Sequence, residues 1–228
     1  MITIKDLSFS YDKKSKVLNS LCLSLSENNI HGIVGLNGAG KTTLLNSIYG
    51  LIKIDSGIIS SEGKNLTKKD ISYLVTENFF YSNITGREYL SLFKNETFDS
   101  DKWNGLFSLP LDQIVDGYST GMKKKLALMG ILKQDKPIMI LDEPFNGLDI
   151  ETCRIIRSIL LRLKDKGKTI IITSHIIETL TNLCDYIHYL EKGTISYSKG
   201  KHDFAEFERK LFESIENKNV ELITELIE

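Results

Sequence analysis

The sequence predicts an α/β fold: a largely parallel sheet flanked by helices, with an antiparallel portion at the N-terminus and a short helical insertion. Apolar and polar residues alternate in the first segments, which indicates strands, and apolar residues recur at helical spacing in the middle of the chain. After the middle, short apolar runs alternate with helical segments. The chain has 228 residues, 41% of them hydrophobic, which suffices for one sizeable core. We therefore expect a single domain over residues 1–228.

The first third of the chain predicts several strands and one helix. Alternation in "DLSFSY" and "SLCLSLS" indicates two half-buried strands, and "SGIISSEGKN" is typical of a hairpin. The apolar run "IHGIVG" predicts a buried strand that leads through glycines into a helix with Leu44, Leu45 and Ile48 on one face. Another strand is expected at "ISYLV", so this part mixes antiparallel and buried strands.

Helical periodicity then dominates, and we expect a helical insertion over about residues 77–132. After it, "IMIL" and "TIIIT" predict buried strands. The segment between these strands has apolar residues at helical spacing from Ile155 to Leu163. Strands that alternate with helices imply a largely parallel sheet.

The chain is expected to end in a hairpin and an amphipathic helix. The hairpin is "YIHYLEKGTISYS", with Lys192 and Gly193 at its turn. The helix covers about residues 200–228, with an apolar face made of Phe204, Phe207, Leu211 and Ile215.

Composition narrows the function classes. The formal net charge of -1 argues against a protein that neutralises nucleic-acid phosphates over a broad basic face, so we expect no nucleic-acid partner. Cys22, Cys153 and Cys184 are odd in number and far apart, which predicts buried thiols in a reducing compartment. The N-terminus lacks a signal-peptide pattern, and no apolar run approaches the ~20 residues of a membrane span. We expect a cytosolic chain whose membrane role needs a partner.

The segment "GLNGAGKT" fits the phosphate-loop pattern Gly-x-x-x-x-Gly-Lys-Thr between a predicted strand and a predicted helix. Glycines let the backbone curl so that N–H groups face phosphate oxygens, and the helix N-terminus adds partial positive charge. Lys41 is expected to bridge the β- and γ-phosphates, and the Thr42 hydroxyl to ligate Mg²⁺. The predicted fold is thus that of a P-loop NTPase. Its nucleotide-binding candidates are Gly35, Leu36, Asn37, Gly38, Ala39, Gly40, Lys41, Thr42 and Thr43.

Two carboxylates end the buried strand in "IMILDEP". Asp142 can hold a magnesium-bound water opposite Thr42. Glu143 is placed to orient and deprotonate a water that attacks the γ-phosphate, which distinguishes a hydrolase from a kinase. The alternative for Glu143 is a solvated acidic turn.

Three further positions have two readings each. His175 follows the strand "TIIITS", where it either has a structural role or faces a bound nucleotide. Tyr11 either packs in the core or stacks on an adenine ring. The stretch "YSTGMKKKLAL" either forms a second anion site from a Ser, a Gly and a helix N-terminus, or is a helix cap with a solvated basic face.

The phosphate loop, "YSTGM", "ILDEP", "NGLD" and "TSH" occur in the order found in nucleotide-binding domains of ABC transporters, which the chain resembles over nearly its whole length. The resemblance implies that His175 is the γ-phosphate switch and that Tyr11 stacks on the adenine. It also implies that Asn146 to Asp149 form the loop after the catalytic Glu143, with Asp149 a nucleotide-site residue.

The same resemblance gives the "YSTGM" segment a function between chains. In the family two domains face each other head to tail, so Ser119 and Gly121 of one chain would complete the γ-phosphate site of the other. The second chain would be another copy or a homologous ATPase. Hydrogen bonds to a charged phosphate are worth roughly 1.5–3 kcal/mol each, so losing the γ-phosphate could open such a dimer.

The sequence also departs from the family pattern. Thr120 stands where a second Gly is usual, and Met122 where Gln is frequent. Thr76, followed by Glu77, occupies the place of the family's magnesium-sensing Gln. The helical insertion is short for the family, and "TENFFYSN" before it contains three successive aromatics. These either form an exposed docking site for the membrane subunit or pin the insertion to the sheet.

We therefore expect an ATPase that uses ATP and Mg²⁺, with Lys41, Glu143 and His175 as catalytic residues. ATP-driven closure of a dimer and reopening after hydrolysis would drive a membrane-spanning transporter subunit from the cytoplasmic face of the membrane. "YSTGM" and "NITGREYL" most resemble bacterial exporters of drugs, antibiotics or peptides. The alternative is a soluble mechanical ATPase acting on ribosomes or chromosomes, whose coiled-coil insertions or paired cassettes this chain has no room for.

Overall fold

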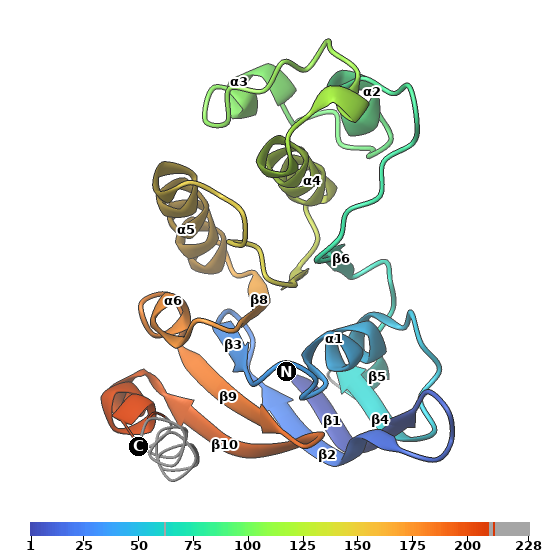
Figure 1. The fold of residues 1–228 in the computed structure, drawn as a ribbon, viewed down its shortest axis with the longest axis vertical. Helices are drawn as coiled ribbons and strands as arrows, with labels where there is room; N and C mark the ends of the chain where they lie inside the picture. Colours follow the sequence, from blue (N-terminus) through green and yellow to red (C-terminus); the bar gives the residue numbers. More distant parts are fainter. Residues whose placement is uncertain (62, 210–211, 213–228) are drawn as a thin grey trace, which may run out of the picture.

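The centre of the fold is a six-stranded sheet of β3 (Ile30–Val34), β6 (Ile71–Leu74), β7 (Ile138–Leu141), β8 (Thr169–Ser174), β9 (Tyr186–Glu191) and β10 (Thr194–Gly200). The computed structural model, drawn in Figure 1, describes residues 1–61, 63–209 and 212. The strand order is β10–β9–β3–β8–β7–β6, and every neighbouring pair is parallel except β10 with β9. The predicted, largely parallel sheet is confirmed.

A four-stranded antiparallel sheet comes from the N-terminal part, with β1 (Ile2–Ser10), β2 (Lys16–Leu25), β4 (Ser56–Ser61) and β5 (Lys64–Asn65) in the order β2–β1–β4–β5. The two sheets meet where the turn between β9 and β10 passes β2. There the Asn19 N–H donates to the Gly193 carbonyl over 3.0 Å. Lys192 and Gly193 both have positive φ, as the predicted tight hairpin turn requires.

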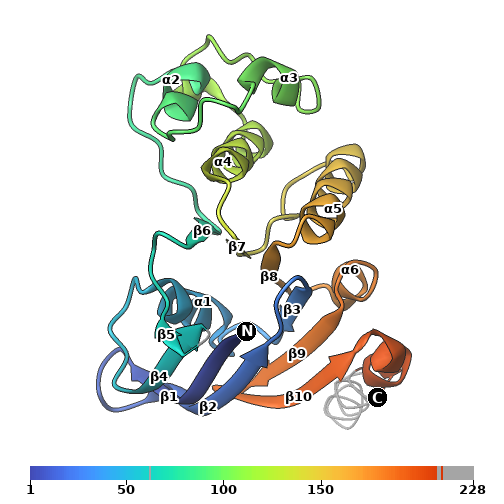
Figure 2. The same cartoon turned by 180° about the vertical axis from the view of Figure 1, so that it is seen from behind.

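The helices are α1 (Lys41–Tyr49), α2 (Gly86–Ser91), α3 (Ser100–Asn104), α4 (Thr120–Gln134), α5 (Ile150–Asp165) and α6 (Ile177–Thr181), with 3₁₀ turns at Val115–Gly117 and Lys201–Asp203. Figures 1 and 2 place α2, α3 and α4 together at one end of the long axis, and β1, β2 and β4 at the other. Among the described residues, no helix is long and apolar enough to cross a membrane.

The central sheet separates two hydrophobic clusters, because its side chains alternate between its faces. Ile138 and Ile140 of β7 pack with α1 and the antiparallel sheet. Met139 and Leu141 of the same strand pack on the other side, with residues of α4, α5 and α6. The carboxyl ends of the strands are thereby held in place from both faces.

Two expectations need correction. Within residues 77–132, α2 and α3 are short, and helical structure begins at Gly86 and continues past the expected end to Gln134. The capping box of Thr85 and Glu88 starts α2 there, and Gly105 ends α3. Cys184 is buried as predicted, but Cys153 is only half-buried and Cys22 is exposed, because Cys22 lies on the outward face of β2.

The C-terminal helix was predicted over about residues 200–228, and only its first part is described. Residues 204–209 are helical, and Phe204 and Phe207 are buried against the larger cluster. Leu211 and Ile215 lie outside the described residues.

Candidate functional site

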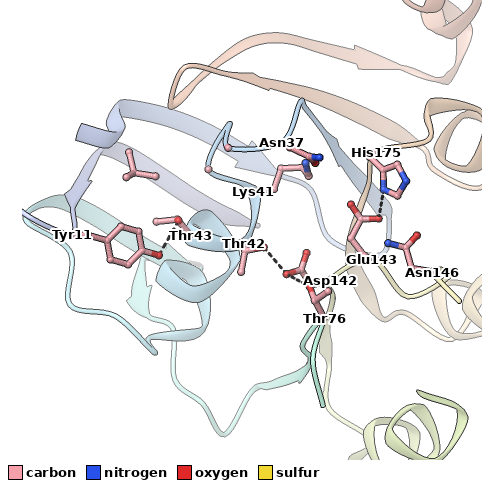
Figure 3. A pocket seen from close by; sticks show the side chains of 13 residues that line it. Tyr11, Asn37, Lys41, Thr42, Thr43, Thr76, Asp142, Glu143, Asn146 and His175 are labelled. Carbon is pink, nitrogen blue, oxygen red and sulfur yellow. Dashed lines mark hydrogen bonds and ion pairs between the residues drawn. The ribbon is translucent and has the colours of Figure 1, made fainter. Parts of the chain in front are cut away.

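A cavity of about 620 Å³ opens at the carboxyl ends of the parallel strands β3, β6, β7 and β8 (Figure 3). In open parallel sheets this edge is the usual place for a ligand. Thirteen residues line the cavity: Tyr11, Val17, Asn37, Gly38, Gly40, Lys41, Thr42, Thr43, Thr76, Asp142, Glu143, Asn146 and His175. Most of the residues predicted for the nucleotide therefore lie together, although they come from distant parts of the sequence.

The backbone of the loop between β3 and α1 takes a conformation that requires glycine at two positions. A Cβ at Gly35 would lie 2.4 Å from the Leu190 carbonyl oxygen, and Gly40 has a φ of 104°. Gly40 starts α1 without a side-chain cap, so the N–H groups of the first turn are open to an anion. The Lys41 ammonium donates to the carbonyls of Gly35 (2.7 Å) and Leu36 (3.3 Å), and so folds back over the loop.

Three hydroxyls converge on the Asp142 carboxylate, which is 1% exposed. Thr42 and Thr76 each donate to Oδ2 over 2.8 Å, and Thr173 donates to Oδ1 over 2.5 Å. A hydroxyl next to a carboxylate is an all-oxygen donor set, which fits the hard cation Mg²⁺. The predicted pair of Thr42 and Asp142 is therefore in direct contact, and Thr76 joins it. Glu77 is exposed and does not line the cavity.

Glu143 lies at the rim of the cavity in a left-handed conformation, with a φ of 50°. Such a conformation is uncommon outside glycine and costs free energy that surrounding contacts must offset. Its N–H donates to Thr173 Oγ1 over 2.9 Å, and its Oε2 lies 3.0 Å from His175 Nδ1. Figure 3 shows these two side chains next to each other, joined by this contact. The predicted base and the predicted switch thus form one pair.

Tyr11 does not pack in the core, and that reading was wrong. Its side chain is 66% exposed, whereas Phe9 is 8% exposed and takes the core position. The Tyr11 ring packs edge-to-face on Phe9, and its hydroxyl lies 3.1 Å from Thr43 Oγ1. These contacts hold the ring at the cavity wall, where its face is open to a planar ligand.

Ser119, Gly121 and Asp149 do not line this cavity. Ser119 caps α4 by accepting from the Met122 N–H over 3.2 Å, as the helix-cap reading predicted. The solvated basic face of that reading was wrong, because Lys124 is 6% exposed. Asp149 caps α5, and hydrogen bonds from Thr152 lower the pKa of Asp149 to about 2. Its carboxylate lies 3.5 Å from Lys125 Nζ.

Sequence analysis missed two residues that hold the site. Thr173, the next-to-last residue of the buried strand β8, forms hydrogen bonds with both Asp142 and Glu143. Lys124 is one of three successive lysines, which gave no reason to separate it from its neighbours. It is 6% exposed, and burial lowers its pKa against the opposing attraction of the Glu143 and Asp142 carboxylates.

The fold and the site together define a phosphate-loop ATPase: a glycine-rich loop ahead of a helix, a buried Asp beside its Thr, and a Glu next in the chain. The family described as ABC transporter matches residues 18–146, which is more than half of the chain. The chain therefore belongs to the ABC transporter family, as an ATP-binding subunit and an ATPase.

Known relatives agree along almost the whole chain. It is 32% identical to the ABC transporter ATP-binding protein NatA of Bacillus subtilis, over 92% of this chain and 93% of NatA. It is 30% identical to the lantibiotic transport ATP-binding protein SrtF of Streptococcus pyogenes, over 93% of this chain and 96% of SrtF. A solved dimeric bacterial ABC transporter cassette, 21% identical, has the same fold, with a TM-score of 0.78 over 88% of this chain and 99% of that chain.

Proposed function

We propose that this chain hydrolyses ATP with Glu143 as general base and uses the cycle to drive a membrane-embedded exporter. The observation that carries the proposal is the pairing of Glu143 with His175 at the rim of the cavity, facing the phosphate loop. A carboxylate beside the γ-phosphate position can orient and deprotonate an attacking water, which is what hydrolysis requires.

Different residues of the cavity bind the nucleotide and catalyse its hydrolysis. Tyr11 supports the adenine, and the loop N–H groups with the α1 N-terminus hold the phosphates. Lys41 exchanges its contacts with the Gly35 and Leu36 carbonyls for the β- and γ-phosphates. Glu143 then takes a proton from the attacking water, while His175 fixes the Glu143 carboxylate through their hydrogen bond and contacts the γ-phosphate.

Mg²⁺ would be held by Thr42 and Asp142 and would neutralise charge on the β- and γ-phosphates. Thr76 lines the cavity and already donates to Asp142, whereas Glu77 does not line it. We therefore assign the place of the missing family Gln to Thr76.

The chain works as a dimer, with a second copy or a homologous ATPase. Ser119 and Gly121 lie outside the cavity of their own chain, yet a Ser hydroxyl, a Gly N–H and the N-terminus of the fifteen-residue helix α4 suit an anion. A head-to-tail partner would bring them onto the γ-phosphate. The dimeric state of the solved cassette supports this arrangement.

The membrane-spanning partner docks on the segment after β6. Phe79 and Tyr81 are 79% and 61% exposed and contact each other edge-to-face at 5.6 Å. Phe80 turns inward and packs on Tyr89 at 4.8 Å, so it pins the insertion while its neighbours stay free. Phe80 therefore fits the reading in which an aromatic pins the insertion, and the exposed Phe79 and Tyr81 are the residues that we propose for docking. The partner would place the chain on the cytoplasmic face, and the likeness to SrtF, a lantibiotic transport protein, favours export.

Glu143→Gln tests the proposal. The variant should bind ATP but turn over roughly 100- to 10,000-fold more slowly, because the water loses its base. It should also accumulate as an ATP-bound dimer. Phosphate release and size-exclusion chromatography measure the two effects. Glu77→Gln is the matched control, since Glu77 is exposed and outside the cavity lining. Normal turnover in Glu143→Gln would refute the assignment of the base.

A further inference from the structure

Lys124 is a buried cation whose ammonium group contacts backbone only. It lies in the second turn of α4, is 6% exposed, and does not line the nucleotide cavity. Its Nζ donates to the Glu143 carbonyl over 2.7 Å and to the Asn146 carbonyl over 3.0 Å. Burying an ammonium group costs free energy unless its hydrogen bonds are made, so the two carbonyl acceptors are what stabilise Lys124 at this position.

A hydrogen bond to the Glu143 carbonyl helps to fix the backbone of this residue, and so the position of its side chain. Glu143 is in the left-handed region, and its peptide groups are bonded on both sides. Thr173 accepts from its N–H, and Lys124 donates to its carbonyl. Without Lys124 the Glu143 carbonyl would keep only the longer hydrogen bond from the Asn146 N–H (3.3 Å). The strained backbone could then relax, and the carboxylate would leave its position beside His175.

The same turns of α4 touch the loop after Glu143 at two more places. A Cβ at Gly121 would lie 3.3 Å from the Gly147 carbonyl oxygen, so the backbones approach closely. Lys125 Nζ lies 3.5 Å from the Asp149 carboxylate. Helix α4, capped by Ser119, thus contacts the loop that begins with Glu143 at several places, and Lys124 is the most buried of the α4 residues that make these contacts.

We propose that Lys124 is a positioning residue for hydrolysis, which holds the Glu143 carboxylate in place through the Glu143 carbonyl and couples that position to α4. This inference rests on Glu143 as the base. We assign the first residues of α4 to contacts with the nucleotide bound by the partner chain. A displacement of α4 would therefore move the Glu143 carboxylate through the hydrogen bond of Lys124. Engagement of one site could thereby adjust the base of the other.

A double-mutant cycle with Glu143→Gln tests it, using single-turnover ATP hydrolysis by the purified chain. Lys124→Met keeps length and apolar bulk but loses the donors, and should slow hydrolysis about 10- to 100-fold, in the range of lost catalytic positioning. ATP affinity, measured with a fluorescent nucleotide, should stay within about twofold, because the phosphate contacts remain. In the Glu143→Gln background the same change should cost less than about threefold.

Two more variants separate positioning from folding. Lys124→Arg retains donors for both carbonyls and should recover most of the rate, whereas Lys133→Met, in the last turn of the same helix, should match wild type. If Lys124→Met is too unstable to assay, Lys124→Gln, which retains a neutral donor, takes its place in the cycle.

The outcomes distinguish the two proposals. Equal losses in both backgrounds, or a rate loss that follows melting temperature alone, would overturn the role of Lys124 and leave the base intact. Unimpaired turnover in Glu143→Gln alone would instead overturn the base.

Discussion

At the residue scale, His31 of β3 and His188 of β9 form a buried hydrogen-bonded relay. His31 and His188 are 1% and 2% exposed, and their Nδ1 and Nε2 atoms lie 3.1 Å apart. The Ser26 carbonyl can only accept, so His31 Nε2 carries the proton there and His31 Nδ1 accepts from His188. His188 Nδ1 is then left to accept from Ser198. Every hydrogen bond of this relay is therefore made when both imidazole rings are neutral.

This relay predicts a loss of stability in acid. Burial first, and the neighbouring His31 second, lower the pKa of His188 to about 3 from 6.5. Because the unfolded state binds the proton more readily, this contribution is complete above pH 6.5 and is lost as pH falls toward 3. Between pH 7 and pH 5 the loss from His188 should be about 2 kcal/mol in the free energy of unfolding.

Urea denaturation at the two pH values checks it. In His188→Gln the difference between pH 7 and pH 5 should shrink by most of that amount. His202→Gln, at an exposed histidine, should leave the difference unchanged. An equal pH dependence in all three proteins would show that the relay does not titrate as described.

At the scale of elements, the segment between β6 and α2 is the docking surface that we propose for a membrane-spanning partner. Phe79→Ala should weaken association with the membrane-spanning partner at least about tenfold, because exposed aromatics are frequent anchors of interfaces. Basal ATP turnover should persist, since Phe79 does not line the cavity. Pull-down, ATPase assay and thermal melting measure the three quantities together.

Ile58→Ala supplies the control for this docking surface, since Ile58 is 60% exposed on β4, away from the aromatic segment. Association that survives Phe79→Ala unchanged would contradict the docking assignment. The same holds if a large fall in melting temperature accounts for the lost association.

Elements with local signals could be predicted from the sequence, and contacts between distant residues could not. The phosphate loop and the hairpin at Lys192 are set by their own glycines and flanking apolar residues, and both appear as predicted. The contact of Thr173 with Asp142 depends on β8 pairing with β7. The burial of Lys124 depends on how α4 packs on the loop after Glu143. Neither dependence leaves a periodic pattern in the sequence.

The whole molecule, as proposed, carries two half-sites that meet only between chains. Lys41→Ala protein and Ser119→Arg protein should each be nearly inactive. In a mixed dimer, one site has both defects and the other has neither. If homodimers exchange freely, half of the dimers are mixed, so equal mixing should restore about a quarter of the wild-type rate. Titrating one variant into the other while following phosphate release measures this.

Mixing equal amounts of wild type and Lys41→Ala is the control for independent sites, because about half of the wild-type rate should remain whether or not subunits exchange. A Ser119→Arg protein that hydrolyses ATP by itself at the wild-type rate would disprove the shared-site arrangement.

The alternation of β7 between the two clusters limits which changes in chain length the protein can tolerate. An insertion or deletion of one residue among Ile138–Leu141 would turn every following side chain to the opposite face and exchange the partners of both clusters. A change of two residues would keep the faces but carry the Asp142 carboxylate roughly 7 Å along the strand, away from Thr42. The number of residues in this strand is therefore as constrained as their chemistry, whereas surface loops elsewhere can lengthen at little cost.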